Sequence, residues 1–350
     1  MSALIGERRY HDVDLPIFRA ELDAFLPQSI YDSHVHVVLP EHVPAVPPEA
    51  VKDSWAAEAP HELSLEELAV AQAHIFPGRQ VRSLAFTMPV SYADIEAGNA
   101  YIAGGIAAGQ IDGLLVLRPE WTQEKVLNLV RKGGFVGFKP YPGLVGSRTD
   151  HTVSIDDYFP PMHQEIADEL GLIALIHLPR PERLRDPRNL GELHRLVSRR
   201  PNIRLIIAHI GRAYTLSFAE PGLAALRDLP TLYHDFAMNL NPDVIELALR
   251  EIGPERLLYG SDLPICLMRG VREHRGDEYI NFSDGQYTWN TPDRRKPPEI
   301  EAQYTLYIYE QLRALKTAAE RVGLTPQQVA QVMGENARSL VEAARQAQLP

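Results

Sequence analysis

The chain has 350 residues, of which 45% are hydrophobic and 23% charged, so it can bury a sizeable core. Its formal net charge of −11 argues against non-specific binding to nucleic acid or to an anionic membrane surface. A single cysteine, Cys266, excludes an internal disulfide. Charges interrupt the first segment where a signal peptide needs an apolar run, and no apolar stretch reaches membrane-spanning length. We therefore expect a cytoplasmic protein without a membrane partner.

Short β-rich segments recur along the chain, and helical patterns separate them. Several of these segments are almost wholly apolar, which is typical of strands buried on both faces. The predicted strands are Ser29–Val37, Arg82–Pro89, Ile111–Pro119, Gly134–Pro142, Leu172–Pro179, Ile203–Gly211, Thr231–Ala237 and Arg256–Pro264.

Capping and stop signals mark the helices. Ser64 and Glu67 form a capping box at the start of a helix that runs to about His74. Thr122 precedes a helix that stops at a pair of glycines, and Pro242 opens another. Further helices are expected at Pro161–Leu170, at Asn189–Arg199, and twice after Glu299, the second opening at Thr325.

Strands that alternate with helices favour a parallel sheet with right-handed crossovers. Eight such units favour a closed (β/α)8 TIM barrel of the α/β class. A doubly wound open sheet is the alternative, but no glycine-rich phosphate loop follows the first strand. We expect a single domain over residues 1–350, with an N-terminal extension at 1–28 and C-terminal helices at 299–350. Two smaller domains are the other possibility.

Two long segments, Val37–Leu63 and Ile265–Pro298, follow the first and the eighth predicted strand. Both therefore stand at the carboxyl ends of strands, where barrels build their active sites. The second segment is rich in arginine and aromatic residues. We expect both to border the functional site.

Two histidines, His34 and His36, close the first strand. They project from the same face because strand side chains alternate. Alone, such a pair is more often an exposed polar face than half of a metal site. Further candidate ligands end later strands: Lys139, His177, His209 and Asp262. In a barrel these groups meet at one mouth, and imidazoles with a carboxylate suit Zn²⁺, and also Mn²⁺ or Fe²⁺.

Each candidate also has a structural interpretation when it is taken singly. His177 and His209 would be hydrogen-bonded core histidines, and Asp262 would cap a turn. His234 is a further candidate, although its neighbour Asp235 competes for the inward-facing position. The position that the candidates share at strand ends is what favours a metal site.

The motifs DSHVH, AHIG, YGSDLP and GENARSL occur in this order and resemble those of the amidohydrolase superfamily. Their combination is most similar to the amidohydrolase-2 branch, which includes aminocarboxymuconate-semialdehyde decarboxylase and related lactonases. The likeness extends from Ile30 to Leu340. It implies a TIM barrel and a divalent metal, and it leaves the substrate open because this superfamily carries many reactions on one scaffold.

The resemblance implies four metal ligands: His34, His36, His177 and Asp262. It gives His209 the role of orienting or activating water or substrate. Lys139 matches the lysine that is carboxylated and bridges two metals in binuclear members. We expect one metal, most simply zinc, because the AHIG and YGSDLP context matches the mononuclear branch; two metals would require a carboxylated Lys139.

Such a site supports hydrolysis, because a divalent metal lowers the pKa of bound water to about 7 and polarises a carbonyl. Asp262 would act as general base and then general acid, and His209 would hydrogen-bond the developing oxyanion.

Residues near the predicted strand ends suggest a small carboxylated substrate, because arginine binds carboxylates through two hydrogen bonds. The candidate substrate-binding residues are Lys139, Arg118, Tyr141, Arg180 and Arg212, with Tyr214 nearby in sequence. The segment after the eighth strand adds Arg269, Arg272, Arg275, Tyr279, Tyr287 and Trp289. Taken singly, each arginine could instead pair with one of the protein's own carboxylates.

We therefore expect a metal-dependent hydrolase that acts on a lactone, ester or amide of a small organic acid. A metal-dependent non-oxidative decarboxylase is the alternative, although several decarboxylases of the branch carry a glutamate where this chain has His34. A non-catalytic barrel that has kept its metal is a remote third possibility. We expect no nucleic-acid partner, and we take a homo-oligomer as the assembly.

Overall fold

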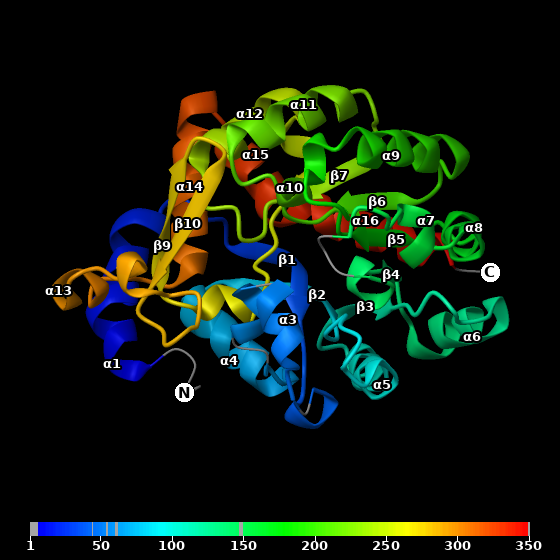
Figure 1. Ribbon diagram of the computed structural model, residues 1–350, viewed down its shortest axis with the longest axis horizontal. Coiled ribbons are helices and arrows are strands. Elements are labelled where there is room, and N and C mark those ends of the chain that lie inside the picture. The colour runs from blue at the N-terminus through cyan, green and yellow to red at the C-terminus, as the bar shows by residue number, and fades with distance from the viewer. Residues whose placement is uncertain (1–5, 44, 54, 60–61, 147–149, 349–350) are drawn as a thin grey trace.

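The computed structural model describes residues 6–43, 45–53, 55–59, 62–146 and 150–348. Eight parallel strands pair in chain order, each with the next (Figure 1). They are β1 (Ser29–His36), β2 (Gln80–Phe86), β3 (Asp112–Val116), β4 (Gly137–Lys139), β5 (Ile173–Ile176), β6 (Arg204–Ile207), β7 (Leu232–Asp235) and β8 (Leu257–Leu258). Each lies within or next to a strand that the sequence predicts.

Backbone hydrogen bonds join the first strand to the residues that follow the last. The N–H of Ser33 donates to the carbonyl of Tyr259 at 2.9 Å, and that of His36 donates to Leu263 at 2.8 Å. Between them, Asp262 donates to the carbonyl of His34 at 2.9 Å. The sheet thus curls into a barrel, which confirms the predicted (β/α)8 class and excludes the open, doubly wound sheet.

Helices surround the strands (Figure 1). The longer ones are α4 (Leu65–Ile75), α5 (Ile95–Ala107), α6 (Gln123–Gly133), α8 (Pro161–Glu169), α9 (Pro187–Arg199), α11 (Leu216–Leu226), α12 (Pro242–Ile252), α14 (Tyr307–Val322) and α16 (Asn336–Ala347). Short helical segments lie between them: η5 (Pro142–Leu144), α7 (Ile155–Tyr158), η6 (Arg183–Arg185), α10 (His209–Arg212), η7 (Pro254–Arg256), η8 (Ile265–Leu267), η9 (Pro292–Arg294), α13 (Pro298–Glu301), α15 (Pro326–Ala330) and η10 (Gln331–Glu335).

The structure contains the helix capping box and the glycine helix end that the sequence predicts. The Ser64 hydroxyl accepts from the N–H of Glu67, whose carboxylate accepts from the N–H of Ser64. Gly134 ends α6 in the left-handed conformation, at φ 68°. Helices α5 and α11 were not predicted, because glycines weaken the pattern of α5 and Pro221 lies inside α11.

The N-terminal extension is helical over α1 (Glu7–Arg9), η1 (Tyr10–Asp14), α2 (Leu15–Ile17) and η2 (Phe18–Leu22). Arg313 of α14 donates to the carboxylate of Glu21 at 2.7 Å, which holds this extension against the C-terminal helices. Within the described part of the chain, no helix is both long and apolar enough to cross a membrane.

The long segment after β8 contains a hairpin that the sequence did not reveal. Its strands, β9 (Gly270–Arg275) and β10 (Glu278–Ser283), pair antiparallel. Gly276, at φ 58°, makes the turn between them. Polar residues on both strands hide the alternation that would predict them. The hairpin stands beside the barrel (Figure 1).

The segment after β1 forms η3 (Pro40–His42), α3 (Pro48–Asp53) and η4 (Trp55–Glu58). It touches the segment after β8: Thr288 donates to Glu58 through its N–H at 2.7 Å and its hydroxyl at 2.6 Å. The rings of Trp55 and Trp289 lie 6.1 Å apart. The two long segments thus meet each other.

Candidate metal centre

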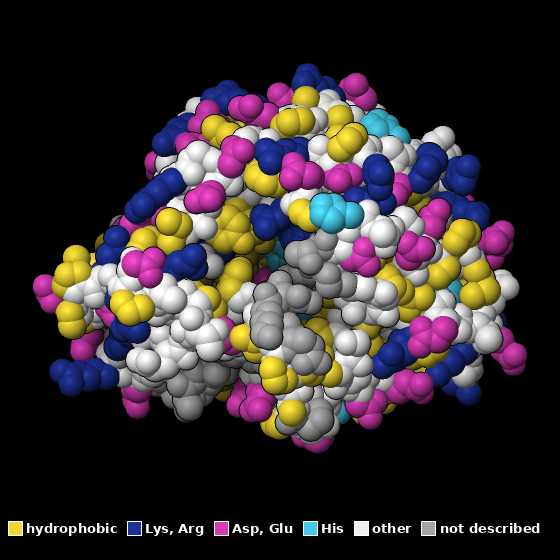
Figure 2. All heavy atoms as spheres, in the orientation of Figure 1, with side chains coloured by type: hydrophobic (Ala, Val, Ile, Leu, Met, Phe, Trp, Pro, Cys, Tyr) yellow, Lys and Arg dark blue, Asp and Glu magenta, His cyan; other side chains and the backbone are white. Residues whose placement is uncertain are grey.

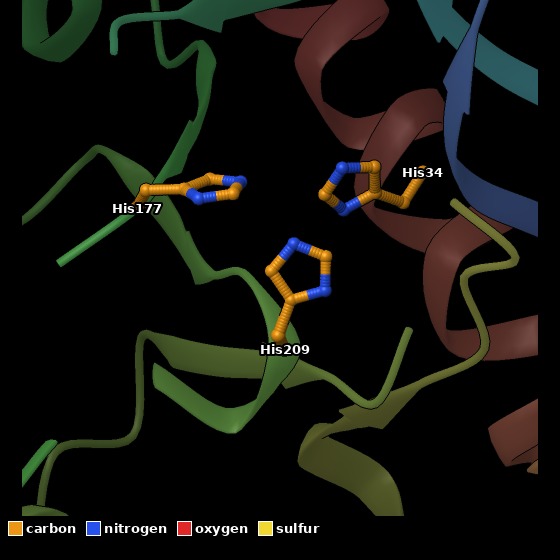
Figure 3. Close-up of side chains that lie close together, drawn as sticks. All are labelled: His34, His177 and His209. Atoms are coloured by element: carbon orange, nitrogen blue, oxygen red, sulfur yellow. The ribbon is translucent and has the colours of Figure 1, made fainter. Parts of the chain in front are cut away.

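Imidazoles from three different strands converge on one point inside the barrel mouth. His34 belongs to β1, His177 follows β5, and His209 follows β6. Figure 3 shows their rings pointing toward one another. One ligand atom from each lies within 4.8 Å of the others, and all three side chains are buried. Strand ends that are distant in sequence therefore supply one compact set of nitrogen donors.

His34 also belongs to a second trio, with His36 and Asp262, whose ligand atoms again lie within 4.8 Å. The Nε2 atom of His36 is 3.2 Å from Oδ1 of Asp262, and Nε2 of His34 is 3.4 Å from the same oxygen. The predicted candidates at the ends of β1, β5 and β6 and after β8 thus form a single buried cluster.

Asp235, the last residue of β7, supports two of these histidines. Its Oδ2 lies 2.9 Å from Nδ1 of His34. Its Oδ1 accepts from the N–H of His209 at 2.7 Å and from that of Ala237 at 3.1 Å. These bonds direct Nε2 of His34 into the cluster and hold the backbone of His209.

His209 has a defined hydrogen-bonding state. Its Nδ1 lies 2.9 Å from the carbonyl of Ala237, which can only accept, so Nδ1 carries the proton. Burial lowers the pKa of His209 to about 4, which keeps the ring neutral near pH 7. In this state Nε2 accepts a hydrogen bond and does not donate one.

The backbone at the cluster is held in unusual conformations. His209 and Asp262 have φ values of 57° and 62°, in the left-handed region that non-glycine residues rarely adopt. Oδ1 of Asp32 accepts from the N–H of Ser261 at 2.8 Å and from that of His34 at 3.2 Å. Asp32 and Asp235 therefore fix the two chain segments that carry these side chains.

The protonation states suit a cation. Burial lowers the pKa of His34 well below its usual value, and the charge of Lys139 lowers it further. Burial raises the pKa of Asp262, but the imidazoles of His209, His34 and His36 outweigh burial and hold it below its ordinary range. Near neutral pH the Asp262 carboxylate therefore faces neutral rings of His34 and His209, which is the form that binds a metal.

A sequence profile of the amidohydrolase family, of the amidohydrolase-2 branch, matches residues 31–342. The chain belongs to the amidohydrolase family. Among curated proteins, a sequence search finds no significant match.

Solved structures with the same fold include several enzymes. An amidohydrolase from Burkholderia multivorans with bound zinc is 14% identical, with a TM-score of 0.55 over 89% of this chain and 99% of that one. A probable 2-pyrone-4,6-dicarboxylic acid hydrolase from Acinetobacter baumannii with bound citric acid is 14% identical, with a TM-score of 0.54 over 89% and 99%. A 2,6-dihydroxybenzoate decarboxylase from Rhizobium is 14% identical, with a TM-score of 0.51 over 91% and 99%. At these identities the likeness concerns the fold alone.

In this amidohydrolase, two predicted substrate-binding residues lie beside the cluster. The buried Nζ of Lys139 is 4.6 Å from the ring centroid of Phe86, which itself lies 5.2 Å from the His34 ring. The ring of Tyr141 lies 4.7 Å from that of His177. Both residues therefore lie next to the histidine cluster.

The predicted arginines take different positions in this amidohydrolase. Arg180 pairs with Glu192 of α9 at 2.6 Å and donates to Asn189, so it satisfies the protein's own carboxylate. Arg212 donates to the carbonyl of Leu178 at 2.5 Å. Arg118 lies 3.9 Å from the carboxylate of the nearby Glu120.

The sequence pattern presents Asp235 only as a competitor of His234 for the inward-facing position and gives it no role at the site. The signal was present, because Asp235 stands at a carboxyl strand end like the candidate ligands. Arg183, which lies near Tyr214 and Tyr279, was also missed, since it belongs to a turn without a recognisable motif.

Proposed function

We propose that this amidohydrolase is a metal-dependent hydrolase that cleaves a lactone, ester or amide of a small carboxylate-bearing substrate. The observation that carries the proposal is the buried convergence of His34, His36, His177, His209 and Asp262 in two trios of ligand atoms, each within 4.8 Å. Neutral imidazoles with one carboxylate fit zinc, and also manganese or iron. We assign one zinc ion per chain to the site.

Four residues would hold that ion: His34, His36, His177 and Asp262. When bound, a divalent metal lowers the pKa of water to about 7 and polarises a carbonyl group. The cluster lies at the carboxyl ends of the strands, where a substrate can reach it in a barrel enzyme.

Asp262 is the proposed general base and acid. Because its Oδ1 faces Nε2 of both His34 and His36, we assign Oδ2 as the atom that accepts the proton of the attacking water. The same oxygen then returns the proton to the leaving group. A second acceptor lies close by, at Nε2 of His209.

His209 orients the attacking water as a hydrogen-bond acceptor. We propose this role in place of the oxyanion donor expected from the sequence, because the Nδ1 proton is directed to Ala237 and the neutral ring has no second proton to offer an oxyanion. Lys139 and Tyr141 lie next to the cluster, and we assign them to the substrate.

The test combines metal analysis with a substrate screen. Purified protein loaded with zinc should hold about one equivalent, and it should release acid from a panel of carboxylated lactones, esters and amides. The citrate-bound neighbour that is named as a pyrone-dicarboxylic acid hydrolase makes carboxylated lactones the first substrates to try.

Hydroxybenzoates and carbon dioxide detection complete the screen. Release of carbon dioxide without hydrolysis would make the protein a decarboxylase, and absence of metal would remove both enzyme assignments. The His36→Ala variant, purified in parallel, must lose the activity, which excludes a contaminating esterase.

A further inference from the structure

The hairpin brings a buried arginine against two tyrosines. The guanidinium carbon of Arg272, on β9, lies 4.7 Å from the ring centroid of Tyr214 and 4.8 Å from that of Tyr279, on β10. The two rings meet edge to face at 5.0 Å. Tyr214 lies between α10 and α11, so the hairpin contacts the loop that follows His209.

The hydrogen bonds of Arg272 go only to neutral groups. Its Nε donates to Oδ1 of Asn281 at 2.8 Å, and its Nη1 donates to the carbonyl of Met238 at 2.6 Å. Its Nη2 is buried and has no hydrogen-bond partner among the residues that the structure describes. A buried charge without a counter-charge is unfavourable. An anion bound at Nη2 would therefore stabilise this guanidinium.

A second cation lies by the same pair of rings. The guanidinium carbon of Arg183 is 5.9 Å from both centroids, and its Nη1 donates to the carbonyl of Arg212 at 3.2 Å. Among the residues that the structure describes, neither Arg183 nor Arg272 forms an ion pair with a carboxylate, whereas the neighbouring Arg180, Arg185 and Arg275 each do. Burial raises the pKa of Tyr279, but the charges of Arg272, Arg183 and Arg212 and a hydrogen bond with Trp55 outweigh burial and lower it from its ordinary value.

Arg272 is connected through the backbone to His209 of the histidine cluster. Met238, which accepts from Arg272, directly follows Ala237, whose carbonyl accepts from Nδ1 of His209. Figure 2 shows basic side chains bordering the hollow in the centre of the face on which the hairpin lies. Arg272 therefore lies next to the chain segment that orients His209.

We propose that Arg272, with Tyr214 and Tyr279, forms an anion subsite that binds a carboxylate of the substrate away from the scissile bond. The identity of the substrate rests on the proposed function, but the binding of an anion by Arg272 can be measured without any reaction. A carboxylate oxygen accepts from Nη2 of Arg272 and supplies the missing counter-charge. Inorganic phosphate shares this oxyanion chemistry and is the other anion to be tested.

The test is calorimetric binding of dicarboxylates from succinate to adipate to the zinc-loaded protein, without turnover. Arg272→Met should weaken binding of the best dicarboxylate about tenfold or more, because it removes a charged hydrogen-bond donor. Arg275→Met is the matched control, since Arg275 lies on the same hairpin with an exposed side chain paired to Glu273. The control should bind like the wild type.

A second variant keeps the test decisive if Arg272→Met unfolds. Arg272→Lys retains the charge but not the planar donor set, so it should fold and bind with intermediate affinity. The proposal is overturned if the wild type binds no dicarboxylate, or if neither Arg272 variant binds more weakly than the control. It is also overturned if only phosphate binding depends on Arg272.

Kinetics separate the subsite from the proposed function. On a carboxylated lactone, Arg272→Met should raise KM about tenfold, and the rise in KM should be much smaller for an uncharged lactone, which has no carboxylate for the subsite. Hydrolysis with an unaltered KM would overturn the subsite and leave the hydrolase standing. Arg272-dependent dicarboxylate binding without any hydrolysis would do the reverse.

Discussion

Nδ1 of His34 lies 2.9 Å from Oδ2 of Asp235, and both side chains are fully buried. A carboxylate in this position accepts the Nδ1 proton, which leaves the lone pair of Nε2 directed at Asp262. The other oxygen of Asp235 accepts from the backbone N–H of His209. Asp235 at the end of β7 therefore orients the His34 ring and holds the backbone of His209.

The first prediction follows from this pairing. Asp235→Asn keeps the shape but faces an amide NH₂ either toward Nδ1 of His34 or toward the backbone donors of His209 and Ala237. The first orientation reverses the hydrogen bond to His34 and moves the ring proton to Nε2, and the second loses the bonds to both backbone donors. Zinc affinity, measured by competition with a chromophoric chelator, should fall about 10- to 100-fold. An exposed control, Asp228→Asn, should match the wild type; an unchanged affinity in Asp235→Asn would contradict the assigned role.

The strand-one pair gives the second prediction. His34→Ala or His36→Ala each removes a nitrogen donor whose Nε2 faces Oδ1 of Asp262. Each variant should lose most of its zinc and activity after dialysis, while far-ultraviolet circular dichroism stays unchanged because the barrel core lies in the strands. Full metal content in either variant would show that the pair is not a ligand pair.

Asp262→Asn separates metal binding from proton transfer. The amide keeps one oxygen donor but cannot accept a proton near neutral pH, so zinc should be partly retained. Turnover should fall about 10²- to 10⁴-fold. Metal content and turnover are measured on one preparation, with zinc added back in excess. Full activity after zinc is restored would assign the proton transfer to His209 instead.

Lys139→Met tests the charge at the end of β4. The lysine is fully buried beside Phe86, and methionine fills a similar volume without the charge. With one metal per chain, zinc content should stay near the wild-type value, and KM for a carboxylated substrate should rise. Loss of one equivalent from a protein that holds two would show instead that a carboxylated Lys139 bridges two metals.

The last prediction concerns stability against acid. His234 on β7 is fully buried, and burial, with the nearby charge of Arg256, lowers its pKa to about 3. An unfolded histidine titrates near pH 6.5, so between these values the unfolded chain binds a proton that the native protein does not. The free energy of unfolding should therefore decrease as pH falls from 6.5, by up to about 1.4 kcal/mol per pH unit from this group.

His234→Leu should remove that contribution. Urea unfolding of the metal-free proteins at pH 7 and pH 5 should show a smaller loss of stability for this variant than for the wild type. His151→Leu, at an exposed position, serves as the control and should lose as much as the wild type. Equal losses in all three proteins would show that His234 does not resist protonation.

Local sequence patterns predict most of the strands and helices of the barrel. Apolar runs bounded by turn residues predicted the eight strands, and the capping box at Ser64 and the glycine at Gly134 predicted the ends of two helices. The hairpin at Gly270–Arg275 and Glu278–Ser283 escaped, because neither strand has a continuous apolar face. Whether a polar segment forms a strand depends on the surface against which it packs, and the sequence of the segment does not show that surface.

The sequence by itself determined which strand ends bear His34, His36, His177, His209 and Asp262. It could do so because parallel strands in a barrel place their carboxyl ends at one mouth, whatever the loops do. Only the tertiary structure decided that Arg180 pairs with Glu192, that Asp235 serves both His34 and His209, and that Arg272 lies against Tyr214. An arginine has the same local signature whether its partner is a carboxylate, a carbonyl or an aromatic ring. Its partner is chosen by the side chains that folding brings next to it.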